Sequence, residues 1–140
     1  MQNINDTIND FETFNFPLFS DIVYIVGIQK EEKFIPFYVG QSSRHLGRMG
    51  DYISAQFNAP TDFKVGEAVK YIQQKGFLAV VKFKTTNSRQ ENERRYTMEV
   101  RGMGYELLND LPGFRASISN LEDERKKVQE FIRHKVLSRI

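Results

Sequence analysis

Two short stretches of the chain, Ile22–Ile28 and Phe34–Gly40, are rich in β-branched and aromatic residues. A polar segment, Gln29–Lys33, separates them. Apolar runs of this length on either side of a polar connection are typical of paired antiparallel strands. The sequence therefore predicts a β-hairpin, which later segments extend into a sheet.

Hydrophobic periodicity predicts helices over Arg44–Phe57, Phe63–Lys75 and Ser88–Arg101, and a third strand over Phe77–Phe83. The fold class predicted by this order is α/β or α+β. We expect a small, mostly antiparallel three-stranded sheet flanked by helices.

Local signals mark where the helices begin and end. Gly76 is expected in the C′ position that closes the second helix. Ser88 with Glu91, and Ser119 with Glu122, have the spacing of capping boxes that open later helices.

The last helix carries an apolar stripe along one side. It comprises Leu121, Val128, Phe131, Ile132, Val136 and Ile140. Because a helix with one apolar side is marginal alone, something must cover this stripe. Two alternatives remain open: the same chain covers it, or a second copy covers it in a homodimer.

Three segments follow from this pattern. Residues 1–20 are expected to form an N-terminal arm whose phenylalanines pack on the body, with partner binding as the alternative. Residues 21–115 form the core. Residues 116–140 form a C-terminal helix that packs on the core or mediates dimerisation.

Composition narrows the class of protein. A chain of 140 residues has the size of one domain, and without cysteine it has neither disulfides nor thiolate metal sites. The N-terminus lacks the pattern of a signal peptide, and no apolar run approaches the ~20 residues of a membrane span. We expect a cytoplasmic protein with no membrane partner.

Charge is unevenly distributed along the chain. The net charge is +2, and residues 1–36 contribute two Lys and six Asp or Glu, a net of −4. Residues 37–140 therefore carry a net of +6, obtained as +2 minus −4. A phosphate-binding face would lie in this second part, although a mixed solvated surface would give the same balance.

The first predicted helix places polar residues together. Arg44, Arg48 and Tyr52 are four residues apart, so they share one helix face. This helix follows the strand that contains Tyr38, so the phenol and the guanidinium groups are expected to converge. Arginine gives bidentate hydrogen bonds to phosphate oxygens, which suits a phosphodiester. The alternative is that both arginines are surface charges and Tyr52 is a packing residue.

Glu99 is the candidate metal ligand on the third predicted helix. Mg²⁺ binds through one or two carboxylates and keeps several waters, so one glutamate is enough. The alternative is an ordinary solvated pair with Arg95, four residues earlier. Glu93 is a rival ligand, sixteen residues before Asn109, whereas Glu99 is ten residues before it.

These residues, in this order, resemble the GIY-YIG nuclease family over about residues 22–109. Ile22-Val23-Tyr24 corresponds to the first family motif and Tyr38-Val39-Gly40 to the second. The other correspondences are Arg48 to the helix arginine, Tyr52 to the His-or-Tyr position, Glu99 to the metal ligand and Asn109 to the late asparagine.

This sequence departs from the family pattern in three places. Ile22 replaces the leading glycine, the segment between the two motifs is longer, and Gln41 stands where some members have lysine. Arg44, His45 and Arg48 are left to polarise the Tyr38 phenol.

The resemblance implies metal-assisted hydrolysis of DNA with Mg²⁺ or Mn²⁺. Tyr38 would be the general base, and Tyr24 would form a hydrogen bond that orients Tyr38 or the attacking water. An ordinary tyrosine pKa is about 10, so nearby positive charge must favour the phenolate. Arg48 would stabilise the transition state, and Asn109 would brace the site rather than react.

The proposed DNA contacts are Gln41, Arg44, His45 and Arg48, and Tyr52 would bind the scissile phosphate or transfer a proton. The alternative function is a catalytically silent nucleic-acid-binding or assembly module with the same fold.

Overall fold

The computed structural model describes residues 3–7, 9–11, 21–43, 60–111 and 121–140. The elements along the chain are α1 (Ile4–Thr7), β1 (Asp21–Lys30), β2 (Lys33–Ser42), α3 (Pro60–Gln74), β3 (Leu78–Thr86), α4 (Arg89–Gly102), η1 (Leu108–Asp110), α5 (Leu121–Phe131), η2 (Ile132–Val136) and η3 (Leu137–Arg139). None of the helices in these ranges is long and apolar enough to cross a bilayer.

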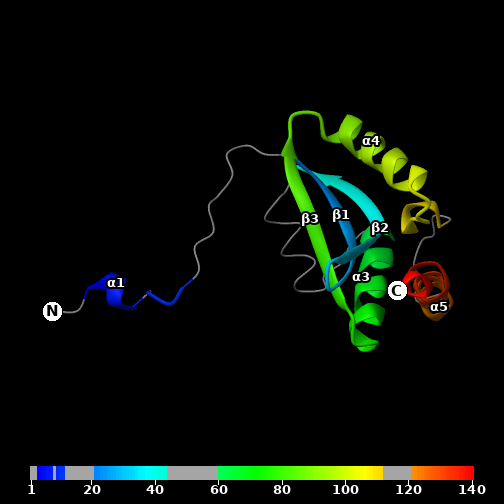
Figure 1. The fold of residues 1–140 in the computed structure, drawn as a ribbon, viewed down its shortest axis with the longest axis horizontal. Coiled ribbons are helices and arrows are strands. Elements are labelled where there is room, and N and C mark those ends of the chain that lie inside the picture. The colour runs from blue at the N-terminus through cyan, green and yellow to red at the C-terminus, as the bar shows by residue number, and fades with distance from the viewer. Residues whose placement is uncertain (1–2, 8, 12–20, 44–59, 112–120) are drawn as a thin grey trace.

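A three-stranded antiparallel sheet lies at the centre of the fold, with strand order β2-β1-β3 (Figure 1). The predicted hairpin is confirmed, but its connection is shorter than expected. Lys30 pairs with Lys33, so only Glu31 and Glu32 form the turn. Glu31 has φ of 56°, a left-handed conformation that a two-residue hairpin turn requires.

The register of β2 shifts by one residue opposite Val26 and Gly27. Val26 pairs with Tyr38, whereas Gly27 pairs with Pro36, so Phe37 is the extra residue of a β-bulge. Pro36 lies in an edge strand, where its missing N–H does not break the sheet.

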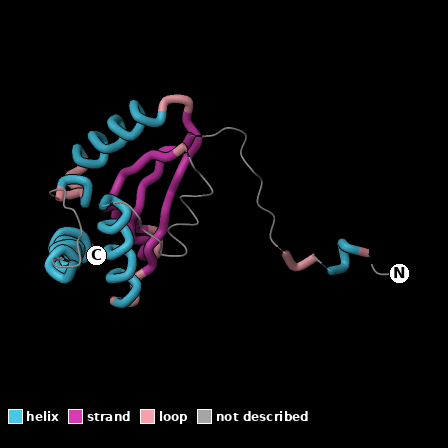
Figure 2. The backbone as a smooth tube through the Cα atoms, turned by 180° about the vertical axis from the view of Figure 1, so that it is seen from behind, coloured by secondary structure: helices cyan, strands magenta, loops and turns pink. Residues whose placement is uncertain are grey.

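Helices cover the two faces of the sheet separately, and Figures 1 and 2 show α4 apart from α3 and α5. On one face, residues of β1 and β2 pack with Val65 and Ile72 of α3 and Val128 of α5. On the other face, Val23 and Val39 pack with Val100 of α4. The predicted α+β class with a three-stranded antiparallel sheet is therefore confirmed.

Gly76 ends α3 as predicted. It has φ of 85°, its N–H donates to the Gln73 carbonyl at 3.0 Å, and the N–H of Phe77 donates to the Ile72 carbonyl at 3.1 Å. These two bonds form a Schellman motif, which needs a residue in the left-handed region.

The predicted capping box of α4 is wrong in its detail. Ser88 is the N-cap residue, but its side chain makes no capping hydrogen bond. Its own N–H instead donates to the Thr86 hydroxyl at 3.1 Å. That contact is part of the turn from β3, which competes with the usual capping geometry.

The C-terminal stripe is covered by the same chain at its centre. Val128, Ile132 and Val136 are buried in the core that also contains Ile72 of α3. The helix is less regular than predicted, since α5 is followed by the π-helical η2 and the 3-10 turn η3. The alternative in which a second copy covers this stripe is therefore not needed for these residues.

Several predictions lie outside the described residues. They include the helix over residues 44–57, the capping serine Ser119 and most of the arm. Within residues 3–11, α1 buries none of its side chains, and Phe11 is exposed rather than packed on the body.

Candidate active site

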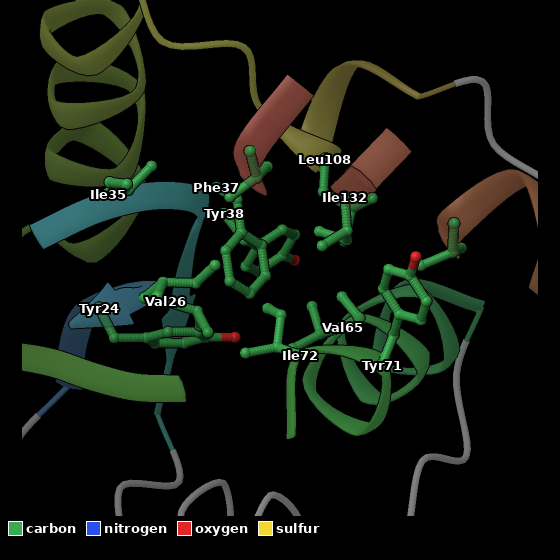
Figure 3. Packing of buried hydrophobic residues seen from close by; sticks show 14 of the residues in the cluster. Tyr24, Val26, Ile35, Phe37, Tyr38, Val65, Tyr71, Ile72, Leu108 and Ile132 are labelled. Carbon is green, nitrogen blue, oxygen red and sulfur yellow. The ribbon is translucent and has the colours of Figure 1, made fainter. Parts of the chain in front are cut away.

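Tyr24 and Tyr38 lie on the same face of the sheet. Their ring centroids are 6.3 Å apart with an interplanar angle of 37°. The β-bulge is the reason, because it turns both Phe37 and Tyr38 toward the face that already holds Tyr24. In Figure 3 both tyrosines project into the core beside Ile72 of α3. Tyr24 is 3 % exposed and Tyr38 is 7 % exposed.

Gly40 makes room for the phenol of Tyr24. The two residues are paired across β1 and β2, and a Cβ at Gly40 would clash with both the ring and the hydroxyl oxygen of Tyr24. The glycine at the end of Tyr38-Val39-Gly40 thus has a packing reason that concerns the other tyrosine.

Asn109 binds the outer edge of β2. Its Oδ1 accepts a hydrogen bond from the Val39 N–H at 3.0 Å, and its Nδ2 donates to the Val39 carbonyl at 2.7 Å. The side-chain amide thus pairs with the edge strand as another strand would. This clamp fixes the backbone of Val39, the residue next to Tyr38.

The short turn η1, which carries Asn109, is held from two further sides. Arg101 of α4 donates from Nε to Asp110 Oδ2 at 3.0 Å. Lys64 of α3 donates to the carbonyl oxygens of Leu108 at 3.4 Å and Leu111 at 3.3 Å. Burial lowers the pKa of Lys64, and Asp110 opposes this shift. η1 therefore joins α3, α4 and the edge of the sheet.

An open cleft of about 430 Å³ lies beside this junction. Its lining is Gln90, Glu93, Arg94, Thr97, Met98 and Arg101 of α4 together with Asn109. The α4 residues recur at three- and four-residue intervals, so they form one face of the helix. The cleft thus combines guanidinium groups, a carboxylate and the amide that braces β2.

Glu93 is the carboxylate in the cleft. Its side chain is half-buried, and desolvation raises the pKa of its carboxyl. No cation lies within ion-pair distance of this carboxylate among the residues that the structure describes. A partly desolvated anion without a cationic partner is stabilised when a cation binds to it.

Glu99 lies elsewhere on α4. It accepts a hydrogen bond from Arg95 Nε at 3.1 Å, in an exposed pair one helical turn apart. It is not among the residues that line the cleft. The environment of Glu99 matches the solvated-pair alternative, whereas Glu93, the rival ligand, lies in the same cleft as Asn109.

The other predicted site residues divide into two groups. Gln41 pairs with Val23 and therefore shares the α4 side of the sheet with Val39, opposite the face of Tyr38. Arg44, His45, Arg48 and Tyr52 lie outside the described residues.

Glu93 is the one acidic residue among the described residues that line the cleft beside Asn109. No group of three or more acidic or imidazole side chains close enough to bind a metal occurs in the part of the chain that the structure describes. Mg²⁺ needs fewer protein ligands than that. Glu93 could supply the carboxylate and Asn109 a neighbouring amide.

Sequence reasoning missed Lys64 as part of this region. The signal was available, since Lys64 precedes Ala68 and Ile72 by four and eight residues and so shares their buried helix face. Arg94 and Arg101 were also missed, although they share with Thr97 the helix face of Glu93.

Comparison of the chain with models of protein families, with curated proteins and with solved structures gives no match.

Proposed function

We propose that this chain is a metal-dependent endonuclease of the GIY-YIG type that hydrolyses DNA phosphodiester bonds. The observation that carries the proposal is that the rings of Tyr24 and Tyr38 lie close together on one face of an antiparallel sheet. The bulge in β2 and the space above Gly40 are both needed for this pairing. Bulges that re-aim a side chain are frequent next to active sites.

In the proposed mechanism, Tyr38 takes a proton from the attacking water and Tyr24 holds its ring in place. A positioned base of this kind contributes roughly 10²–10⁴-fold to the rate. Asn109 maintains the position of Tyr38 through the backbone of Val39. Arg48 is proposed to stabilise the charge that develops on the phosphate.

Mg²⁺ or Mn²⁺ bound beside Asn109, at the outer edge of β2, would supply Lewis-acid stabilisation of the leaving oxygen. The cleft favours Glu93 as its carboxylate, because Glu93 is partly desolvated and has no cationic partner among the described residues, whereas Glu99 pairs with Arg95. We therefore propose Glu93 as the first candidate ligand and keep Glu99 as the second.

The burial of both tyrosines favours a second candidate function. A general base must reach a water molecule, and phenols that are 3 % and 7 % exposed have little access to solvent. A catalytically silent module that binds nucleic acid or assists assembly would use the same tyrosines for packing alone.

Cleavage assays on supercoiled plasmid and on branched DNA separate the two functions. The endonuclease proposal expects cutting in Mg²⁺ and none in EDTA. It also expects Glu93→Gln to abolish cutting and Glu99→Gln to leave it within a few-fold of wild type. Cutting by Glu93→Gln but not by Glu99→Gln would return the metal to Glu99. No cutting of either substrate by wild type would favour the silent module.

A further inference from the structure

A second cationic region lies on the α4 side of the sheet, and it shares no lining residue with the cleft that contains Glu93. We call it the lysine–aromatic strip and define it by Phe34, Lys82, Lys84 and Tyr96. The Lys82 ammonium lies 4.6 Å from the centroid of the Phe34 ring, and the Lys84 ammonium lies 4.9 Å from that of Tyr96. The two lysines alternate along β3 and so project from the same face, about 7 Å apart along the strand.

Both lysines are exposed. No carboxylate lies within ion-pair distance of Lys82 or Lys84 among the residues that the structure describes, although most other cations near α4 have one. Arg89 pairs with Asp21, and Arg95 pairs with Glu99. The strip therefore presents uncompensated positive charge, which complements a polyanion.

An apolar hollow of about 170 Å³ lies between the two lysines and α4. It is lined by Val23, Ile25, Lys82, Phe83, Lys84 and Tyr96. The hollow has an apolar floor, an aromatic wall and a cationic rim. A DNA duplex keeps the faces of its bases stacked on one another and would leave such a floor unused, whereas an unpaired base has a free face that would fill it.

We propose that the lysine–aromatic strip binds single-stranded nucleic acid. Lys82 and Lys84 bind consecutive backbone phosphates, and one unpaired base packs against Tyr96 in the hollow. Aromatic packing combined with a cationic track is the usual way in which proteins bind single strands. The inference goes beyond the proposed function, because it concerns binding and holds for a catalytically silent chain as well.

The lysines can exchange their present contacts for phosphate. An exposed cation–π contact is weak, and Lys84 also donates to the Tyr96 hydroxyl. An ammonium that moves from a ring to a phosphate gains a charge-assisted hydrogen bond and frees the ring for a base.

Fluorescence anisotropy with a labelled 12-mer of oligothymidylate tests the proposal, in EDTA so that cleavage plays no part. A labelled 12-mer of abasic backbone has the same phosphates without bases. The variants are Lys82→Gln/Lys84→Gln and Tyr96→Leu. The control is Lys126→Gln/Arg133→Gln, which removes two exposed positive charges from α5 and η2.

The proposal expects wild type to bind oligothymidylate more tightly than the abasic strand. Lys82→Gln/Lys84→Gln should weaken binding of both and reduce the salt dependence, d log K/d log[salt], by about 1.4, since each single-strand phosphate contact contributes roughly 0.7. Tyr96→Leu should weaken oligothymidylate binding roughly five-fold or more and leave the abasic strand unchanged. The control should change the slope by less than the strip variant.

Two kinds of outcome would overturn the proposal, one against the phosphate contacts and one against the base. Equal slopes for Lys82→Gln/Lys84→Gln and for the control would remove the phosphate contacts from the strip. Equal affinity of wild type for the two strands, or an unchanged preference in Tyr96→Leu, would remove the base from the hollow. Neither outcome depends on whether the chain cleaves DNA.

Discussion

Single residues decide whether the two tyrosines can share one face of the sheet. Tyr24 lies over Gly40, and no side chain larger than hydrogen fits there without displacing the phenol. At the hairpin turn, Glu31 has a left-handed conformation, which is unfavourable for most residues other than glycine, asparagine and aspartate. The strain in the hairpin is thus in its turn, away from the tyrosines.

Gly40→Ala tests the fit at Tyr24. The added methyl group should force the Tyr24 ring away from Tyr38 and lower the free energy of unfolding by about 1–3 kcal/mol, as overpacking usually does. Gly102→Ala is the matched control, because nothing lies within 4 Å of a Cβ at that position. Denaturant unfolding of both variants gives the comparison. Equal stabilities would show that Tyr24 does not depend on the space at Gly40.

Glu93 should make stability depend on pH in a definite direction. Desolvation raises its pKa in the folded state, so folding favours the protonated form. Its contribution to stability is present below the unfolded pKa and is lost as the pH rises through the raised folded pKa. Glu93→Gln, which stays neutral, should therefore melt at a higher temperature than wild type at pH 7.

The melting difference between wild type and Glu93→Gln should shrink near pH 4, where the wild-type carboxyl is largely protonated. Glu99→Gln is the control, since it loses only an exposed ion pair, which contributes little to stability, and it should not gain stability. A Glu93→Gln variant that melts below wild type at pH 7 would mean that the charged carboxylate is stabilised in the folded protein. Glu93 could then no longer be described as lacking a cationic partner among the described residues.

Among the elements, the short turn η1 contacts three others. Three residues connect to three neighbours: β2 through Asn109, α4 through Asp110 and α3 through the carbonyl of Leu108. Through these contacts, η1 joins both helices to the edge strand that carries Tyr38.

Asn109→Asp separates the two halves of the amide clamp. The acceptor for the Val39 N–H is kept, but the donor becomes an oxygen that faces the Val39 carbonyl. We expect the amide of Val39 to exchange faster with solvent in Asn109→Asp than in wild type, and unfolding to cost about 1–3 kcal/mol less. Hydrogen exchange followed by NMR measures both, and unchanged protection of Val39 would contradict the clamp.

Elements whose signals are local were predicted well from the sequence. The hairpin follows from its two β-branched runs. The end of α3 follows from Gly76, because glycine readily adopts the left-handed conformation found there, with φ of 85°. The bulge at Phe37 was not predicted, because an extra residue in a strand changes the pairing partner and leaves the local composition unchanged. The missing cap at Ser88 was not predicted either. The Ser88 N–H donates to the Thr86 hydroxyl in the turn from β3, and this contact is not visible in the spacing of Ser88 and Glu91.

The candidate site was harder to predict because it depends on which helix face meets which strand. Glu93 and Glu99 are both plausible on α4, and only the cleft beside Asn109 distinguishes them. Lys82 and Lys84 have the appearance of ordinary surface lysines in the sequence. Their special feature, the rings beneath them, comes from Phe34 and Tyr96 on other elements.

For the whole molecule, the C-terminal helix acts as part of the core. Ile132 is fully buried with residues of α3 and of the sheet. Ile132→Asp should therefore unfold the chain, since it buries an unpaired charge in the place of an apolar side chain. Circular dichroism and light scattering give the test. A folded monomer after this substitution, from a dimeric wild type, would show that the stripe is an interface between copies.

We propose Tyr38 as the base of a metal-dependent phosphodiester hydrolysis, and the substitution Tyr38→Phe is the direct test of this role. The substitution removes one oxygen, so the fold should persist, as a melting curve can verify. Single-turnover cleavage of DNA in Mg²⁺ is then measured for both proteins. We expect wild type to cleave DNA only with metal, and Tyr38→Phe to cleave it at a rate lower by a factor of roughly 10²–10⁴. A rate within a few-fold of wild type would contradict it.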